Sequence, residues 1–174
     1  GGILNTFLQA QGYTIGTSLS ESSFLDESKK ILNSENCEKI IFPDDVVCAE
    51  DGVLENPQTK DISMVKSSDK ILDVGVDSIS KYTKILRVCQ TIFWNGPLGY
   101  VEKAPYDKGT SEIAKIIANA DCFSAIGGGD TVPVIEKLGL NDQFSFLSTG
   151  GGALMKFFEG SNMPILSKLG LDNK

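Results

Sequence analysis

The residues best suited to chemistry in this chain are three short glycine-rich runs: residues 95–99 (NGPLG), 127–131 (GGGDT) and 150–152 (GGG). A glycine turn ahead of a helix lets backbone N–H groups approach an anion closely, and the positive end of the helix favours phosphate. A single glycine run needs no ligand to explain it, because glycine also occurs simply where the backbone makes a tight turn. Three such runs at equivalent positions of a sheet favour a crevice for an anion or a nucleotide.

Two acidic residues stand beside these runs. Asp130 follows three glycines and precedes Thr131, so beside bound phosphates it could hold Mg²⁺ directly or through water. It could equally cap the helix that follows, and the two roles are compatible. Glu102 comes shortly after the Asn-Gly-Pro turn and is either a partner for ribose hydroxyls or a solvated loop acid. Neither GxxxxGK[ST] nor a clean GxGxxG is present, so no standard nucleotide fingerprint identifies the site.

Composition excludes several other classes of function. Sixteen Lys and Arg against 23 Asp and Glu give a net charge of −7, without a basic block, which argues against nucleic acid or an anionic membrane as partner. The chain has no His, which removes the Ser-His triad and every His-containing metal site. Its four Cys are scattered without a CxxC pair and are expected to be reduced, which fits a cytoplasmic setting. No apolar run approaches the roughly 20 residues of a membrane span.

The glycine runs need elements that bring them to one place, and strands alternating with helices do so in the second half. Apolar strands are expected at 91–94, 122–126 and 144–147, and helices at 77–88, 108–120, 132–138 and 153–159, with Thr110 as a possible N-cap. This pattern predicts an α/β fold with a parallel sheet covered by helices on both faces. Ligands bind at the carboxyl ends of the strands in such sheets, where the three runs fall.

The first half carries weaker signals. Helices are expected at 5–13 and 26–33, and strands at 39–42, 46–49 and 70–74. The polar stretch 50–68 contains Gly52 and Pro57 and is expected to be an exposed excursion. At 174 residues, one domain is the expectation.

Taken together, these runs resemble the carboxy-terminal, nucleotide-binding part of the phosphoglycerate kinases. The resemblance rests on FWNGPLG at 93–99 with Glu102, IGGGDT at 126–131 and STGGGA at 148–153. Upstream, Gly1-Gly2, NTF at 5–7, IGTSL at 15–19 and LDVG at 72–75 also match, in family order. The resemblance implies that residues 1–174 are part of a three-layer, Rossmann-like domain lacking its first strands, and that the amino-terminal domain for the acid substrate is absent.

The resemblance also implies an activity, namely reversible phosphoryl transfer between ATP and 3-phosphoglycerate, giving ADP and 1,3-bisphosphoglycerate, with Mg²⁺. The residues facing the nucleotide phosphates would be Gly128, Gly129, Asp130 and Thr131, with Asp130 on the metal side. Glu102 would face the ribose, and the walls of the adenosine site would be Gly2, Leu19, Gly75, Asn95, Pro97 and Gly99. The transferred phosphoryl group would face the helix start at Gly150, Gly151 and Gly152, with Thr131 beside it. The full-length enzyme is expected to be a cytoplasmic monomer.

Departures from the family pattern leave alternatives open. Tyr100 stands where the family commonly has a valine of the nucleotide wall, and Leu154 and Lys156 replace a Ser and a Glu. The single Arg, Arg87, cannot supply a basic site for the acid substrate, so the chain alone is expected to be inactive. A non-catalytic nucleotide-binding module, or a piece that acts with a partner chain, is the second hypothesis. A dinucleotide-binding oxidoreductase is a third, which the missing fingerprint disfavours.

Overall fold

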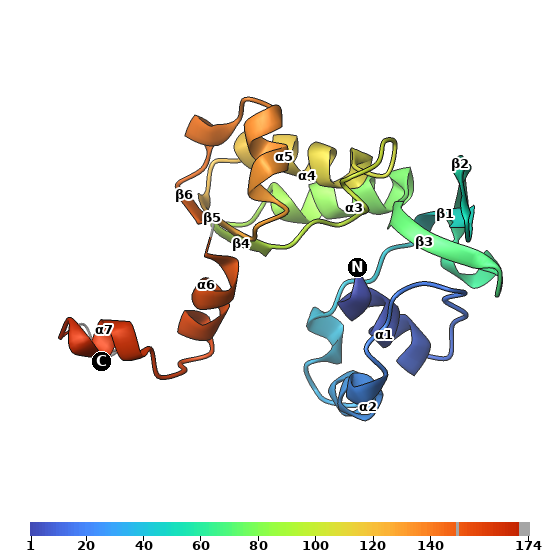
Figure 1. Ribbon diagram of the computed structural model, residues 1–174, viewed down its shortest axis with the longest axis horizontal. Helices are drawn as coiled ribbons and strands as arrows, with labels where there is room; N and C mark the ends of the chain where they lie inside the picture. The colour runs from blue at the N-terminus through green and yellow to red at the C-terminus, as the bar shows by residue number, and fades with distance from the viewer. Residues whose placement is uncertain (149, 171–174) are drawn as a thin grey trace.

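The computed structural model describes residues 1–148 and 150–170, and contains two three-stranded sheets with helices around them (Figure 1). Ahead of the first sheet lie α1 (Gly2–Ala10) and α2 (Leu25–Leu32). The first sheet contains β1 (Asp45–Glu50), β2 (Val53–Asp61) and β3 (Asp69–Val74). The chain continues through α3 (Val76–Leu86), β4 (Thr91–Asn95), α4 (Lys108–Ala118), β5 (Phe123–Gly127), α5 (Val132–Lys137), β6 (Phe146–Ser148), α6 (Gly151–Phe158) and α7 (Pro164–Lys168). Short 3-10 helices occur at Ser22–Phe24, Cys37–Lys39, Ile62–Met64 and Asn141–Gln143.

The second sheet confirms the α/β prediction. Its strands run parallel in the order β4-β5-β6, with Phe93 beside Ala125 and Ala125 beside Phe146. One face packs on α3, α4 and α5 through a buried apolar core whose members are Ile92, Trp94, Ile113, Ala114, Ile117, Ile126, Ile135 and Phe144. On the opposite face lies α6, where the rings of Phe158 and Phe93 have centroids 4.6 Å apart (Figure 1). Helices therefore lie on both faces of this sheet.

The first sheet corrects two predictions. It is antiparallel in the order β2-β1-β3, so the expected strands 46–49 and 70–74 exist but do not join the parallel sheet. The stretch 50–68, expected to be an excursion, contains β2, whose polar side chains are mostly exposed because only its backbone is needed to pair with β1. Residues 39–42 were predicted as a strand and are not one. No described strand pairs with residues 40–42.

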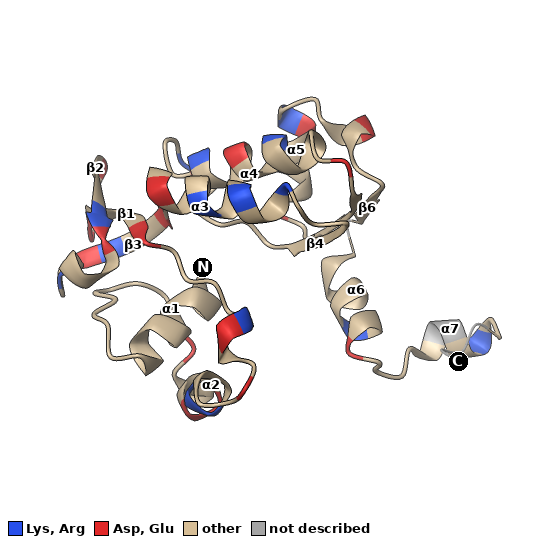
Figure 2. Ribbon diagram, turned by 180° about the vertical axis from the view of Figure 1, so that it is seen from behind, with Lys and Arg blue, Asp and Glu red and all other residues tan. Residues whose placement is uncertain are grey.

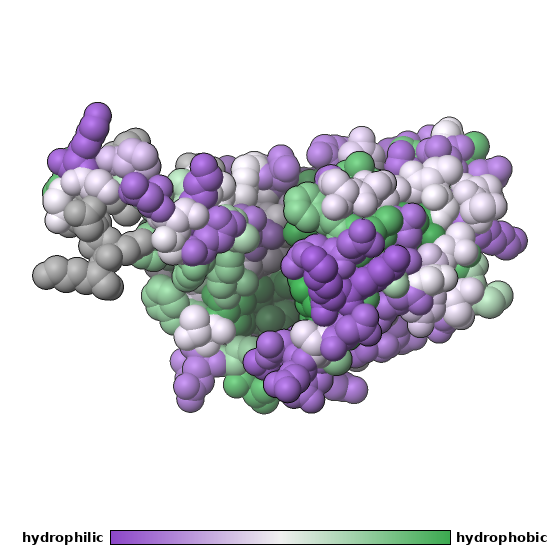
Figure 3. All heavy atoms as spheres, turned by 90° about the horizontal axis from the view of Figure 1, so that it is seen from below, coloured by the Kyte–Doolittle hydropathy of each residue, from purple (hydrophilic) through white to green (hydrophobic). Residues whose placement is uncertain are grey.

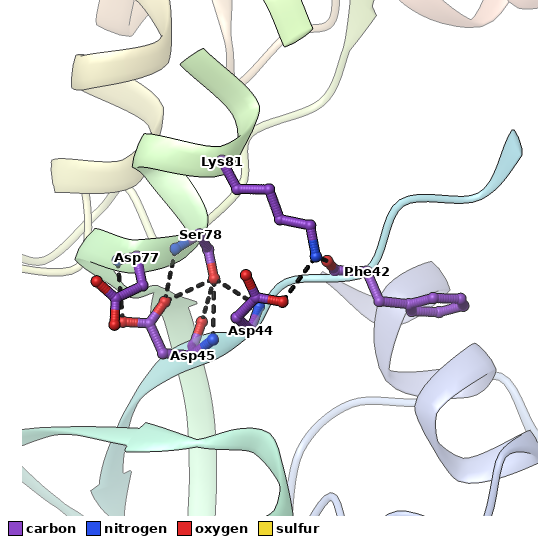
Figure 4. A network of polar contacts seen from close by, with 6 residues as sticks. All are labelled: Phe42, Asp44, Asp45, Asp77, Ser78 and Lys81. Atoms are coloured by element: carbon purple, nitrogen blue, oxygen red, sulfur yellow. Dashed lines mark hydrogen bonds and ion pairs between the residues drawn. The ribbon is translucent and has the colours of Figure 1, made fainter. Parts of the chain in front are cut away.

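A polar network connects the start of β1, in the antiparallel sheet, to the first turns of α3 (Figure 4). The Ser78 hydroxyl is fully buried and accepts hydrogen bonds from the backbone N–H groups of Asp44 (2.9 Å) and Asp45 (3.0 Å). In return, the Asp45 carboxylate accepts the Ser78 N–H at 2.8 Å. Lys81 adds an ion pair with Asp44 at 2.6 Å and donates to the Phe42 carbonyl. The start of β1 is thereby fixed to the first turns of α3.

Charged and apolar side chains are distributed differently over the surface. Both basic and acidic residues occur along α2, α3, α4 and α5 (Figure 2). Apolar side chains instead gather beneath the parallel sheet and along α6 (Figure 3), where the exposed residues include Phe93, Phe123, Phe146, Met155, Phe157 and Phe158. Among the helices of the described ranges, none combines the length and the apolar character needed to cross a bilayer.

Candidate functional site

The three glycine turns meet at the carboxyl edge of the parallel sheet. Asn95, at the end of β4, lies beside Gly127 at the end of β5, and Gly127 lies beside Ser148 at the end of β6. The Gly96 N–H donates a hydrogen bond to the Gly127 carbonyl at 3.4 Å. Parallel pairing in register thus confirms that runs separated by more than 50 residues occupy one edge.

Glycine is required where these turns touch. A Cβ atom on Gly151 would lie 2.7 Å from the Gly128 nitrogen and 2.8 Å from the Asn95 Oδ1. Gly128 also has φ of +120°, a backbone conformation that side chains rarely allow. The turns can approach this closely because their backbones carry no side chains at the contact.

Polar groups without internal partners remain around this contact. Thr131 is fully buried, and its Oγ1 has no hydrogen-bond partner within residues 1–148 and 150–170. That oxygen lies 3.2 Å from the position that a Cβ on Gly128 would occupy. The backbone N–H groups of Gly129, Asp130, Gly151 and Gly152 likewise make no hydrogen bond to a described residue. A buried polar atom left unpaired is costly, so the Thr131 Oγ1 calls for an explanation, and a ligand is one. Gly129, Asp130 and Gly152 are exposed, so their N–H groups are open to solvent or to a ligand.

Asp130 and Glu102 face a small hollow beside the turns. The hollow has a volume of about 250 Å³ and is also lined by Gly129, Asp107 and Lys137. The Asp130 carboxylate is exposed and accepts no hydrogen bond from any described residue, so it does not act as a side-chain cap for α5. Glu102 lines this hollow and also a larger cavity nearby.

The larger cavity, of about 410 Å³, brings together residues from distant parts of the sequence. Five predicted site residues line it, namely Gly2, Leu19, Pro97, Gly99 and Glu102, with the start of α1, β3 and residues 97–102 as walls. Tyr100 also lines it, so the departure from the family's valine falls on this cavity. Further polar lining comes from Asn5, whose Nδ2 donates to the Leu19 carbonyl at 2.9 Å and whose buried Oδ1 has no described partner.

Two predicted wall residues do not line this cavity. Asn95 lies with the glycine turns, because β4 ends at the carboxyl edge of the sheet beside Gly127 and Gly151. Gly75 lies between β3 and α3 and packs against the Asp45 carboxylate. The structure therefore places Asn95 beside Gly127 and Gly151, away from Pro97 and Gly99 of the same run, and Gly75 in the connection behind the cavity wall.

Sequence reasoning missed the role of Asp73, a buried carboxyl on the cavity wall. Its oxygens accept the N–H groups of Gly109 (2.7 Å) and Val74 (2.9 Å). Burial raises the pKa of Asp73 to about 6; these two hydrogen bonds act in the opposite direction, and the charge of Asp107 adds to the increase. The available signal was an acid inside an apolar strand, two residues before a glycine.

Thr110 was predicted as a helix cap and has a different role. It lies within α4, whose N-cap is Asp107. The Thr110 hydroxyl accepts hydrogen bonds from the backbone N–H groups of Leu98 (3.0 Å) and Gly99 (3.4 Å). The Thr110 hydroxyl therefore binds the loop that forms the cavity wall and does not cap its own helix.

Comparison with known proteins assigns the family. A sequence profile of the phosphoglycerate kinases matches residues 1–161. The chain belongs to the phosphoglycerate kinase family. Residues 93–99, 126–131 and 148–153, on which the resemblance rested, all lie within the matched range, and the match gives no support to an oxidoreductase.

Individual relatives agree with this assignment. The phosphoglycerate kinase of Baumannia cicadellinicola subsp. Homalodisca coagulata is 42% identical over 175 residues, which cover all of this chain and 44% of that protein. The phosphoglycerate kinase structure from Coxiella burnetii superposes with a TM-score of 0.84 at 40% identity, over 92% of this chain and 42% of that one. The enzyme from Pyrococcus horikoshii OT3 gives a TM-score of 0.83 at 28% identity, over 98% of this chain and 44% of that one. The chain thus spans less than half the length of the phosphoglycerate kinases it matches.

Proposed function

We propose that this chain supplies the nucleotide side of reversible phosphoryl transfer between ATP and 3-phosphoglycerate, a step of glycolysis that gives ADP and 1,3-bisphosphoglycerate. The observation that carries the proposal is the meeting of three glycine turns around unpaired backbone N–H groups and the unpaired Thr131 hydroxyl. Phosphoryl transfer asks a protein mainly for positioning and for stabilisation of negative charge. Backbone N–H groups provide both without a histidine.

The nucleotide would span the two hollows. Its phosphates would lie against the turn formed by Gly128, Gly129 and Thr131, and the base and ribose would occupy the cavity of about 410 Å³. Glu102 supports this placement because it lines both spaces and can accept hydrogen bonds from ribose hydroxyls. The transferred phosphoryl group would face the start of α6 at Gly150, Gly151 and Gly152, with Asn95 beside it and Gly75 behind the adenosine wall.

The residues present also fit Mg²⁺ brought by the nucleotide. Asp130 offers an exposed carboxylate beside the unpaired N–H groups, and Mg²⁺ is usually bound through one or two carboxylates together with substrate phosphates and water. No group of three or more potential metal ligands occurs in the ranges that the structure describes. Such a site would fill only when nucleotide is present. The bound ion would neutralise charge on the phosphates.

Binding of ADP to this chain tests the proposal by calorimetric titration, with and without Mg²⁺. We expect saturable binding that weakens about tenfold in Asp130→Ala when Mg²⁺ is present, and less when it is chelated. Asp142→Ala, an exposed acid in the 3-10 helix Asn141–Gln143, is the matched control and should bind as the wild type does. Equal Mg²⁺-dependent binding by the Asp130 variant and the wild type would remove Asp130 from the metal side.

Turnover requires the other substrate site. The 3-phosphoglycerate would bind to an amino-terminal domain of the full-length enzyme, and this chain covers only 44% of the relative from Baumannia cicadellinicola. We therefore expect no turnover in a coupled assay of the purified chain. Robust turnover by the chain alone would contradict this division of labour.

A nucleotide-binding piece that works only with a partner chain is the second candidate. It is favoured by β4, which forms an edge of the sheet and borders an apolar hollow of about 510 Å³ lined by Ile41, Phe93 and Trp94 among others. Mixing this chain with a separately produced amino-terminal portion of a relative distinguishes the candidates. Recovered turnover supports the kinase, and binding without turnover supports the non-catalytic piece.

A further inference from the structure

We propose that Thr110 is a positioning residue of the nucleotide cavity, acting through the wall formed by residues 97–99. This inference rests on the proposed function, because it assigns a role within the same site. Thr110 itself does not line the cavity, whereas Pro97, Leu98 and Gly99 do.

The contact between Thr110 and the wall is direct. Its hydroxyl accepts the N–H groups of two consecutive residues, Leu98 at 3.0 Å and Gly99 at 3.4 Å. The Thr110 side chain is fully buried, so water cannot replace the hydroxyl as acceptor. The helix α4 packs into the core through Ile113 and Ile117. The hydrogen bonds from Leu98 and Gly99 to the Thr110 hydroxyl therefore anchor the loop to a helix that is itself held in place.

Two further contacts hold the same wall from behind. Gly99 packs against the Asp73 carboxylate and the Tyr106 carbonyl, which leave no room for a side chain there. The Tyr100 N–H donates to the Leu72 carbonyl of β3 at 2.7 Å. The wall and the residue after it are therefore fixed at three successive N–H groups, those of Leu98, Gly99 and Tyr100, and Thr110 provides the acceptor for the first two.

This arrangement makes a specific prediction about ligands. Only the base and ribose would touch residues 97–99, while the phosphates would contact the glycine turns at the end of β5. Loss of the Thr110 hydroxyl should therefore weaken binding of adenosine and ADP and leave binding of inorganic pyrophosphate unchanged. A residue that only stabilised the fold would affect all three ligands alike.

The experiment compares Thr110→Val, which keeps the shape and removes the acceptor, with Thr110→Ser, which restores it. Calorimetry with ADP, adenosine and pyrophosphate should show about a tenfold loss for ADP and adenosine in Thr110→Val. Pyrophosphate should bind all variants equally, and Thr110→Ser should recover ADP affinity to within about twofold. Ser111→Ala removes a hydroxyl from the next position of α4 and should bind all three ligands as the wild type does.

Several results would overturn the proposal. Unchanged ADP affinity in a folded Thr110→Val variant would do so, as would an equal loss for ADP and pyrophosphate or a failure of Thr110→Ser to recover binding. Wild-type protein that binds neither ADP nor adenosine would instead remove the proposed function, and this inference with it.

Hydrogen exchange of the wild-type chain provides a test that does not depend on a variant that folds. The amides of Leu98 and Gly99 should exchange more slowly than that of Val101, whose N–H has no described partner. Equal exchange at all three amides would show that Thr110 does not hold the wall.

Discussion

The two sheets differ in whether their buried polar groups have hydrogen-bond partners within the protein. In the antiparallel sheet, a buried charge is paired with an internal partner of opposite charge. Lys60 donates to both oxygens of Asp69 at 2.8 Å, and both side chains are largely buried. At the carboxyl edge of the parallel sheet, the Thr131 hydroxyl and nearby backbone N–H groups have no described partner. The first arrangement has internal partners for its polar groups and the second leaves the Thr131 hydroxyl without one, as the proposed binding site requires.

Asp73 shares features of both arrangements, because it is buried and hydrogen-bonded but forms no ion pair with a described Lys or Arg. It is buried on β3, in the antiparallel sheet, yet it holds Gly109 at the start of α4 and lines the cavity. Its two hydrogen bonds do not fully offset the cost of burying its charge, and its pKa is therefore raised. The contrast between the sheets can be tested by breaking each kind of polar cluster in turn.

The largest effect is expected from Lys60→Met, which leaves the buried Asp69 carboxylate without its cation. Removing one partner of a buried ion pair costs about 3–5 kcal/mol of unfolding free energy, measurable by urea denaturation. Lys70→Met is the control, because the Lys70–Asp51 pair is exposed and is worth about 1 kcal/mol or less. Equal losses in the two variants would mean that the Lys60 pair is not a closed structural cluster.

This pair also has a defined pH dependence. Burial opposes ionisation of Asp69, but the hydrogen bonds from Lys60 and from the Lys66 N–H, with the charges of both lysines, lower its pKa below the ordinary value. Its stabilisation is therefore present above the ordinary carboxyl pKa and is lost as pH falls through the lowered value. The Lys60→Met penalty should shrink at low pH.

A smaller effect on stability is expected at Asp73, with the opposite dependence on pH, because its pKa is raised whereas that of Asp69 is lowered. Its folded pKa of about 6 lies above the ordinary 3.8, so its proton stabilises the fold at low pH and this contribution is lost as pH rises through about 6. Two pKa units correspond to about 3 kcal/mol. Relative to the wild type, Asp73→Asn should become more stable by roughly that amount between pH 4 and pH 7, in urea denaturation at each pH. A stability difference that did not change with pH would contradict this assignment.

The smallest change in stability, with a large change in binding, is expected at the glycine turns. Gly151→Ala places a Cβ 2.7 Å from the Gly128 nitrogen, and such overpacking costs about 1–3 kcal/mol and should abolish ADP binding. A Cβ on Gly152 would meet nothing within 4 Å, so Gly152→Ala should be neutral or stabilising by up to about 1 kcal/mol. Thermal unfolding and calorimetry with ADP measure both. Similar behaviour of the two variants would show that the turns are not in contact.

Local pattern was sufficient for most of the elements. The strands expected at 91–94, 122–126 and 144–147 correspond to β4, β5 and β6, and the helix expected at 108–120 corresponds to α4. Apolar periodicity reports such elements because each buries one side within a short stretch of sequence. It failed at 39–42 and 50–68, since pairing depends on which strand lies alongside, and this information lies elsewhere in the chain.

For the candidate site, the sequence by itself indicated the glycine runs, Asp130 and Glu102, because glycines at strand ends and a neighbouring acid are visible as residue types and spacing. Only the tertiary structure decided that Asn95 lies against Gly127 and Gly151, that Gly75 packs on Asp45 and that the Thr110 hydroxyl bonds the N–H groups of the cavity wall. The physical reason is that a cavity wall is built from segments far apart in sequence. The direction of a buried hydroxyl or carboxylate depends on the partners those segments present, which no local pattern encodes.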